Sequence, residues 1–131
     1  MISIASLIYK STKYADAVWN SAHRHTPHLS DGRAKFFFVA NDASDEVKAH
    51  LKTMNYPHFI HENEQVTEKE MLKMGFAPPG YIRRVYQGFN RAIQEAEDTV
   101  ILINSDMMFS PGWMDSLCSE FNGGRVVVSK L

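Results

Sequence analysis

Short apolar runs alternate with longer amphipathic stretches along most of the chain. The runs at 2–8, 35–40 and 99–103 are largely apolar, a pattern typical of strands buried on both faces of a sheet. A shorter run at 58–61 predicts one more strand. Because strands that alternate with helices form parallel sheets with right-handed crossovers, the pattern predicts an α/β fold with a mainly parallel sheet. We expect the strand order 3-2-1-4, counting the four runs along the chain.

The segments between these runs carry helix signals. Ser11 or Thr12 can cap a first helix, and Ser44 can cap a second one. An apolar stripe from Ile82 to Ala96 predicts a helix from about 80 to 97 that crosses over between the third and fourth strands. The other expected elements are a loop at 26–33, a short helix at 67–74, a helix that starts at Ser110 and Pro111 and ends near Phe121, and a last short strand at 125–129.

The bulk properties exclude several classes of protein. A chain of 131 residues forms one domain, and a formal net charge of -1 gives no reason to expect a nucleic-acid partner. No apolar run approaches the roughly 20 residues of a membrane span. The N-terminus lacks the pattern of a signal peptide, and one cysteine excludes an internal disulfide. We therefore expect a cytoplasmic domain, or one held at a membrane surface by parts outside this chain.

The fourth strand ends abruptly in Asn104-Ser105-Asp106. Open parallel sheets bind ligands at the carboxyl ends of their strands. Oxygen-bearing side chains two residues apart at such an end can both turn toward one hard cation, and the cation can hold the phosphates of a nucleotide. The alternative is structural: Asn104 bonds to the backbone and Asp106 sits in a turn or caps a helix.

Other polar residues are expected at the same edge of the sheet. Ser6 and Tyr9 lie at the end of the first strand, and Asn41 and Asp42 follow the second. Arg84, near the start of the long helix, could reach a diphosphate. The structural alternatives are core packing for Ser6 and Tyr9, an Asx turn for Asn41 and Asp42, and a solvated side chain for Arg84.

The remaining residues that could bind a metal or react are expected to have structural roles. The spacing of the three histidines near residue 25 is poor for a metal site on a helix. Structural roles are therefore expected for His23, His25 and His28, for Trp19 and Trp113 as core anchors, and for Cys118 as a buried thiol.

Four segments, in the same order along the chain, match the motifs of a known family. Residues 2–10 match its opening strand, and residues 38–45 match its Val-Asp-Asp-Gly-Ser-x-Asp turn. Gly88 and Ala92 match a Gly-x-x-x-Ala helix, and residues 103–114 match the metal motif in its variant form Leu-Asn-x-Asp…Pro-Gly-Trp-Leu. The chain therefore resembles the nucleotide-sugar-binding half of the family 2 glycosyltransferases, which have the GT-A fold.

The resemblance implies a Rossmann-like three-layer sandwich over residues 1–131. It implies a donor of the UDP- or dTDP-sugar type, a sugar or glycan acceptor, and Mg²⁺ or Mn²⁺ bound at Asn104 and Asp106. Asn41 takes the place of the aspartate that holds the base, and Asp42 matches the second aspartate. Asn41 can still pair with a base, because an amide both donates and accepts. Tyr86 is a departure, since the family usually has Asn there.

The resemblance also implies that the acceptor-binding half and the catalytic carboxylate lie beyond Leu131. We therefore expect a donor-binding fragment in which no catalytic residue can be named, with Asp115 the first to examine if transfer occurs. Uncovered apolar residues at 126–128 are expected to drive self-association.

Three other functions remain open from the sequence. A non-catalytic nucleotide- or sugar-binding module is favoured by Asn at two acidic positions of the motifs. A sugar-phosphate nucleotidyltransferase would need a Gly-rich, basic loop after the first strand, and residues 6–11 contain no glycine. A receiver-like signalling domain would need acidic residues at the end of that strand, where the chain has Ser6 and Leu7.

Overall fold

The structure is a computed structural model that describes residues 1–63 and 79–121. The short helix expected at 67–74 and the strand expected at 125–129, together with its apolar surface, lie outside the described residues.

Four parallel strands form one sheet in the order β3-β2-β1-β4. The expected order and direction are therefore confirmed. In register, Ile8 lies opposite Ala40 and Ser6 lies opposite Ile103, so the carboxyl ends of the three strands meet at one edge of the sheet. The strands are β1 (Ile2–Ile8), β2 (Ala34–Asn41), β3 (His58–His61) and β4 (Thr99–Ile103).

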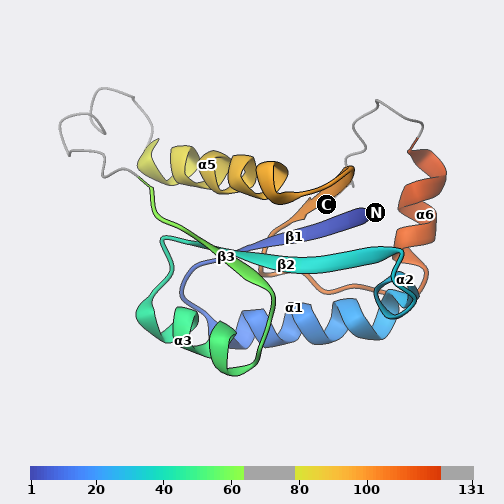
Figure 1. The fold of residues 1–131 in the computed structure, drawn as a ribbon, viewed down its shortest axis with the longest axis horizontal. Coiled ribbons are helices and arrows are strands. Elements are labelled where there is room, and N and C mark those ends of the chain that lie inside the picture. The colour runs from blue at the N-terminus through green and yellow to red at the C-terminus, as the bar shows by residue number, and fades with distance from the viewer. Residues whose placement is uncertain (64–78, 122–131) are drawn as a thin grey trace.

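Helices cover both faces of the sheet and complete a three-layer, Rossmann-like sandwich (Figure 1). Helices α1 (Thr12–His25) and α3 (Asp45–Thr53) lie against one face, and α5 (Pro79–Glu95) lies against the other. Two shorter helices, α2 (Pro27–Ser30) and α6 (Trp113–Glu120), lie near the amino end of β1. The edge where the strands end is thus clear of these two helices.

The core is divided by the alternation of side chains along the strands. Phe36 and Phe38 of β2 pack in a large cluster with buried residues of α1 and α3, such as Val18 and Leu51. The intervening residues of β2, with Ala5 of β1, pack in a smaller cluster against Ala92 of α5. A strand buried on both faces therefore needs apolar residues at successive positions, as β2 has.

The N-terminal caps of α1 and α3 are among those predicted from the sequence. The Ser11 hydroxyl accepts a hydrogen bond from the Tyr14 backbone N–H, and the Ser44 hydroxyl accepts one from the Val47 N–H. Each bond satisfies a donor that the helix itself leaves unpaired, which fixes where the helix begins.

Two predictions of local structure are wrong. The segment 26–33 is not only a loop, because Pro27 has the backbone angle of a first helical residue and begins α2. Helix α6 begins at Trp113 rather than at Pro111, because Gly112 stands at the cap with a left-handed φ of 75°.

Two predictions of burial are also wrong. Cys118 is exposed, because α6 buries only Met114 and its last turn lies outside the core. Strand β4 was expected to be buried on both faces, but only Ile103 is buried. Within the described ranges, β4 is an edge strand with β1 as its one neighbour.

Within residues 1–63 and 79–121, no helix has the length and apolar character that crossing a membrane requires.

A polar contact joins α1 to α3 and to the turn between α3 and β3. Asp16 of α1 accepts hydrogen bonds from the ring of His50, at 2.7 Å, and from the hydroxyl of Tyr56, at 2.8 Å. Burial raises the pKa of Tyr56 to about 12, and the bond to the Asp16 carboxylate adds to this effect. Burial acts to raise the pKa of Asp16 too, but its hydrogen bonds outweigh that effect and lower the pKa.

Replacing Tyr56 by Phe should change how stability depends on alkaline pH. The raised pKa means that the folded state favours the neutral phenol, so its contribution is complete below pH 10 and is lost as pH rises to about 12. The free energy of unfolding should fall more steeply over this window in the wild type than in Tyr56→Phe. At pH 7 the variant should be less stable by roughly 1–2 kcal/mol. Urea denaturation at several pH values measures both effects, and Tyr86→Phe, at an exposed tyrosine, should keep the wild-type slope.

Candidate functional site

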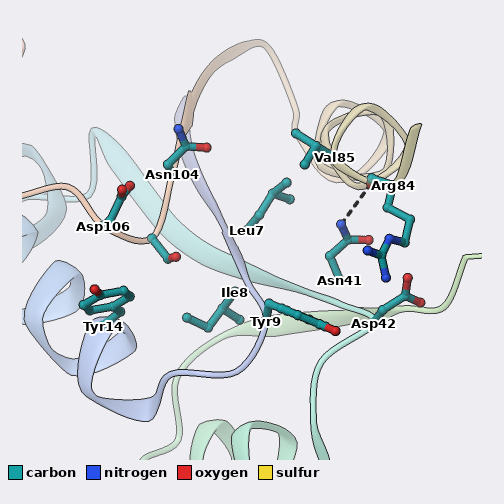
Figure 2. Close-up of a pocket in the computed structure, with 11 residues that line it drawn as sticks. Leu7, Ile8, Tyr9, Tyr14, Asn41, Asp42, Arg84, Val85, Asn104 and Asp106 are labelled. Atoms are coloured by element: carbon teal, nitrogen blue, oxygen red, sulfur yellow. Dashed lines mark hydrogen bonds between the residues drawn. The ribbon is translucent and has the colours of Figure 1, made fainter. Parts of the chain in front are cut away.

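A cavity of about 250 Å³ opens at the carboxyl ends of β1, β2 and β4 (Figure 2). Its floor is apolar and comes from the end of β1, while polar side chains stand on either side. Asn104 and Asp106 lie on one side, and Asn41, Asp42 and Arg84 lie on the other. The lining residues are Leu7, Ile8, Tyr9, Tyr14, Asn41, Asp42, Arg84, Val85, Asn104, Ser105 and Asp106.

Asn41 is the last residue of β2 and is 92% buried, with a relative exposure of 8%. Its amide Nδ2 donates to the backbone carbonyl of Arg84 at 2.9 Å, and its Oδ1 accepts from Asn63 Nδ2 at 2.7 Å. The two partners demand opposite ends of the amide, so the amide has one orientation.

Asp42 follows with a left-handed backbone, at φ 49°. Its backbone N–H donates to the carbonyl of His61, and both carboxylate oxygens accept hydrogen bonds from Asn63. The left-handed turn ends the strand pairing and brings the carboxylate to the cavity.

Helix α5 approaches the sheet very closely at Gly88. A Cβ at this position would lie 2.8 Å from Asn41 Cγ and Nδ2, and 3.0 Å from Leu7 Cδ2. Only glycine lets the helix backbone come close enough for the Arg84 carbonyl to accept the Asn41 amide. Gly88 and the buried Ala92, one turn later, thus give a physical reason for the Gly-x-x-x-Ala pattern.

Tyr9 and Arg84 lie together at the rim of the cavity. The residue Tyr9 is 44% exposed, and the Arg84 guanidinium lies 5.9 Å from the centroid of its ring. A half-exposed ring beside a cation offers a flat surface on which another planar group can stack.

Asn104 and Asp106 are exposed in the loop that follows β4. Within residues 1–63 and 79–121, no group of three or more His, Cys, Asp and Glu side chains could hold a metal ion. Two side-chain oxygens alone cannot complete the coordination of Mg²⁺ or Mn²⁺, which take about six ligands. A cation at this place would therefore have to share its coordination with phosphate and water.

The structure brings six of the seven residues expected at the site to one cavity, and Ser6 is the exception. Ser6 is fully buried within β1, and its hydroxyl donates to the Leu7 carbonyl at 3.3 Å. It lies between Ile4 and Ile8, which pack toward α1, so its side chain points to that face of the sheet. The six that line the cavity are Tyr9, Asn41, Asp42, Arg84, Asn104 and Asp106.

Three residues of the site were missed in the sequence. Tyr14, in the first turn of α1, and Val85 of α5 line the cavity directly. Asn63 contacts both Asn41 and Asp42 from beyond the end of β3. Asn63 could have been found from its position in the sequence, because it stands two residues after the end of a short strand. The last residue of that strand, His61, pairs with Asn41.

Asp115 lies elsewhere. Its carboxylate is 3.3 Å from the ring of the buried His28, near the amino end of the sheet, and it does not line the cavity.

Comparison with known proteins gives a similarity of fold. No protein-family model matches the chain, and no curated protein does. The chain is similar to the crystal structure of residues 1–349 of Staphylococcus aureus TarS, a glycosyltransferase, with a TM-score of 0.57 and 18% sequence identity. The match covers 90% of this chain and 31% of the TarS chain, so the chain spans about a third of that structure. The match shows that this chain shares the fold of that part of TarS.

Replacing Gly88 by Ala should destabilise the protein. In an ordinary helix the change stabilises by about 1 kcal/mol. Here the added methyl group meets Asn41 and Leu7, and we expect a net loss of about 1–3 kcal/mol in the free energy of unfolding. Urea denaturation measures the loss. Gln94→Ala, at an exposed position of the same helix, should stay within about 0.5 kcal/mol of the wild type. A Gly88→Ala protein as stable as the wild type would contradict the close approach.

Proposed function

We propose that this chain is the nucleoside-diphosphate-sugar-binding domain of a metal-assisted glycosyltransferase. One observation carries the proposal. A single cavity at the strand ends has amide, carboxylate and guanidinium groups on one side and the pair Asn104 and Asp106 on the other. This is the arrangement that a ligand with a planar base at one end and phosphates at the other would need.

The nucleoside occupies the side formed by Asn41, Asp42 and Tyr9. Asn41 and Asp42 supply hydrogen-bonding groups for the base or ribose, and Tyr9 supplies a ring for stacking. Arg84, beside that ring, is placed to attract the negative charge of the diphosphate.

The diphosphate points toward Asn104 and Asp106. These residues would hold Mg²⁺ or Mn²⁺ together with the phosphate oxygens, and a bound cation would supply positive charge to the departing nucleoside diphosphate. In the full reaction an acceptor hydroxyl oxygen forms a bond to the anomeric carbon as the bond from that carbon to the diphosphate breaks. The hydroxyl proton passes to a base.

Three features support this function. The turn from β1 to α1 contains Tyr9, Lys10 and Ser11 and has no glycine, unlike the phosphate loop of a nucleotidyltransferase. The glycosyltransferase-like fold supports a transferase. The resemblance of the motifs, from the turn at Asn41 to the Asn104-x-Asp106 segment, supports a nucleotide-sugar donor.

Removing the metal should weaken nucleotide binding through Asp106. We expect wild-type affinity for UDP, measured by calorimetry in the presence of Mn²⁺, to fall at least tenfold on addition of EDTA. Asp106→Ala should bind UDP as weakly as the EDTA-treated wild type and should not respond to EDTA. Asp115→Ala, far from the cavity, serves as the matched control and should behave as the wild type. Binding that is equal in all samples, with or without metal, would refute the role of Asp106.

The isolated chain should bind UDP-sugars without transferring sugar. In the described residues the carboxylates that line the cavity are Asp42 and Asp106, and the proposal gives both another role. A base must reach the acceptor hydroxyl, and neither is free to do so. Product formation with simple sugar acceptors measures transfer, and robust transfer would place the base among these residues. In any longer protein that contains this chain, the same assay separates a glycosyltransferase from a non-catalytic binding module.

A further inference from the structure

The side chain of Asn63 is fully used by its neighbours. Its Nδ2 donates to Asn41 Oδ1 at 2.7 Å and to Asp42 Oδ2 at 2.9 Å. Its Oδ1 accepts from His61 Nε2 at 3.1 Å, and its backbone N–H donates to Asp42 Oδ1 at 2.8 Å. The residue therefore joins the end of β3 to both polar residues at the end of β2.

This network fixes what Asn41 and Asp42 can offer a ligand. The amide of Asn41 is held from both ends, by the Arg84 carbonyl at Nδ2 and by Asn63 at Oδ1. Within the described part of the chain, one N–H of Asn41 Nδ2 has no partner. Each carboxylate oxygen of Asp42 accepts one bond from Asn63 and keeps a further lone pair. The pair thus presents a donor on Asn41 beside an acceptor on Asp42.

We propose that Asn63 is a positioning residue that sets the base selectivity of the nucleotide site, an inference that rests on the proposed function. A donor beside an acceptor complements the adjacent carbonyl and N–H of uracil. In the same pose, cytosine would bring its amine against the Asn41 N–H and its ring nitrogen against the Asp42 carboxylate. The site therefore selects uracil over cytosine, and it does so only while Asn63 holds the pair in place.

Substitutions at position 63 separate hydrogen bonding from packing. Asn63→Ala removes both donated side-chain bonds. Asn63→Asp keeps the shape and the bond from His61, but it turns an acceptor toward Asn41 Oδ1 and Asp42 Oδ2. If the donated hydrogen bonds matter, Asn63→Asp should bind UDP more weakly than Asn63→Ala. If Asn63 only fills space, the isosteric Asn63→Asp should bind UDP more tightly than Asn63→Ala.

The test is calorimetry of UDP and CDP, each with Mn²⁺, on folded wild type and variants. The wild type should bind UDP more tightly than CDP. Asn63→Ala should weaken UDP binding about three- to tenfold, the effect of losing one to two modest hydrogen bonds. Asn63→Ala should weaken CDP binding less than UDP binding, so that the ratio of the two Kd values moves toward one. Asn63→Asp should lose more UDP affinity than Asn63→Ala. Glu62→Gln, at the exposed neighbouring position, should keep the wild-type affinities and ratio.

Each outcome has one meaning. If the wild type binds neither nucleotide, the proposed function fails. If the wild type binds UDP but does not prefer it to CDP, or if folded Asn63 variants keep the wild-type ratio, the positioning role of Asn63 is overturned and the proposed function stands. A variant in which both affinities fall by the same factor also overturns it, because a loss without a change of ratio reports general damage to the site. Circular dichroism of each variant confirms that the protein under test is folded.

Discussion

Parallel pairing of β1 with a strand on each side is the constraint on which the site depends. Because β2 and β4 run in the same direction as β1 and in close register with it, all three strands end at the same edge. Tyr9, Asn41 and Asn104 then lie at those ends, although they lie far apart in the sequence. An antiparallel β4 would have carried Asn104 and Asp106 to the opposite edge of the sheet.

The close approach of α5 to the sheet turns this edge into an ordered cavity. Gly88 removes the side chain that would hold the helix away, and the Arg84 carbonyl then reaches the amide of Asn41. Asn63 completes the support from the other side. Helix α5 therefore holds Asn41, and the segment at the end of β3 holds both Asn41 and Asp42. This support reduces the conformational freedom that a ligand would otherwise have to remove.

The sequence predicted those features that local patterns determine. Apolar runs located the strands, and Ser11 and Ser44 located two helix starts, because a strand or a cap depends on a few adjacent residues. Asn63 was missed because its role comes from pairing between β2 and β3. The prediction that Cys118 is buried was wrong, because helical periodicity identifies a face of the helix but does not tell whether that part of the helix reaches the core. Ser6 was placed near the strand end correctly, but its direction depends on the alternation along β1.

The exposed position of Cys118 has a practical consequence. It is the single cysteine of the sequence, and α6 lies near the amino end of the sheet, away from the cavity. A maleimide fluorophore would therefore attach at one defined atom and leave the strand ends untouched. The wild-type chain thus carries its own reporter position for anisotropy or energy-transfer experiments, with no need to remove other thiols or to introduce a new one.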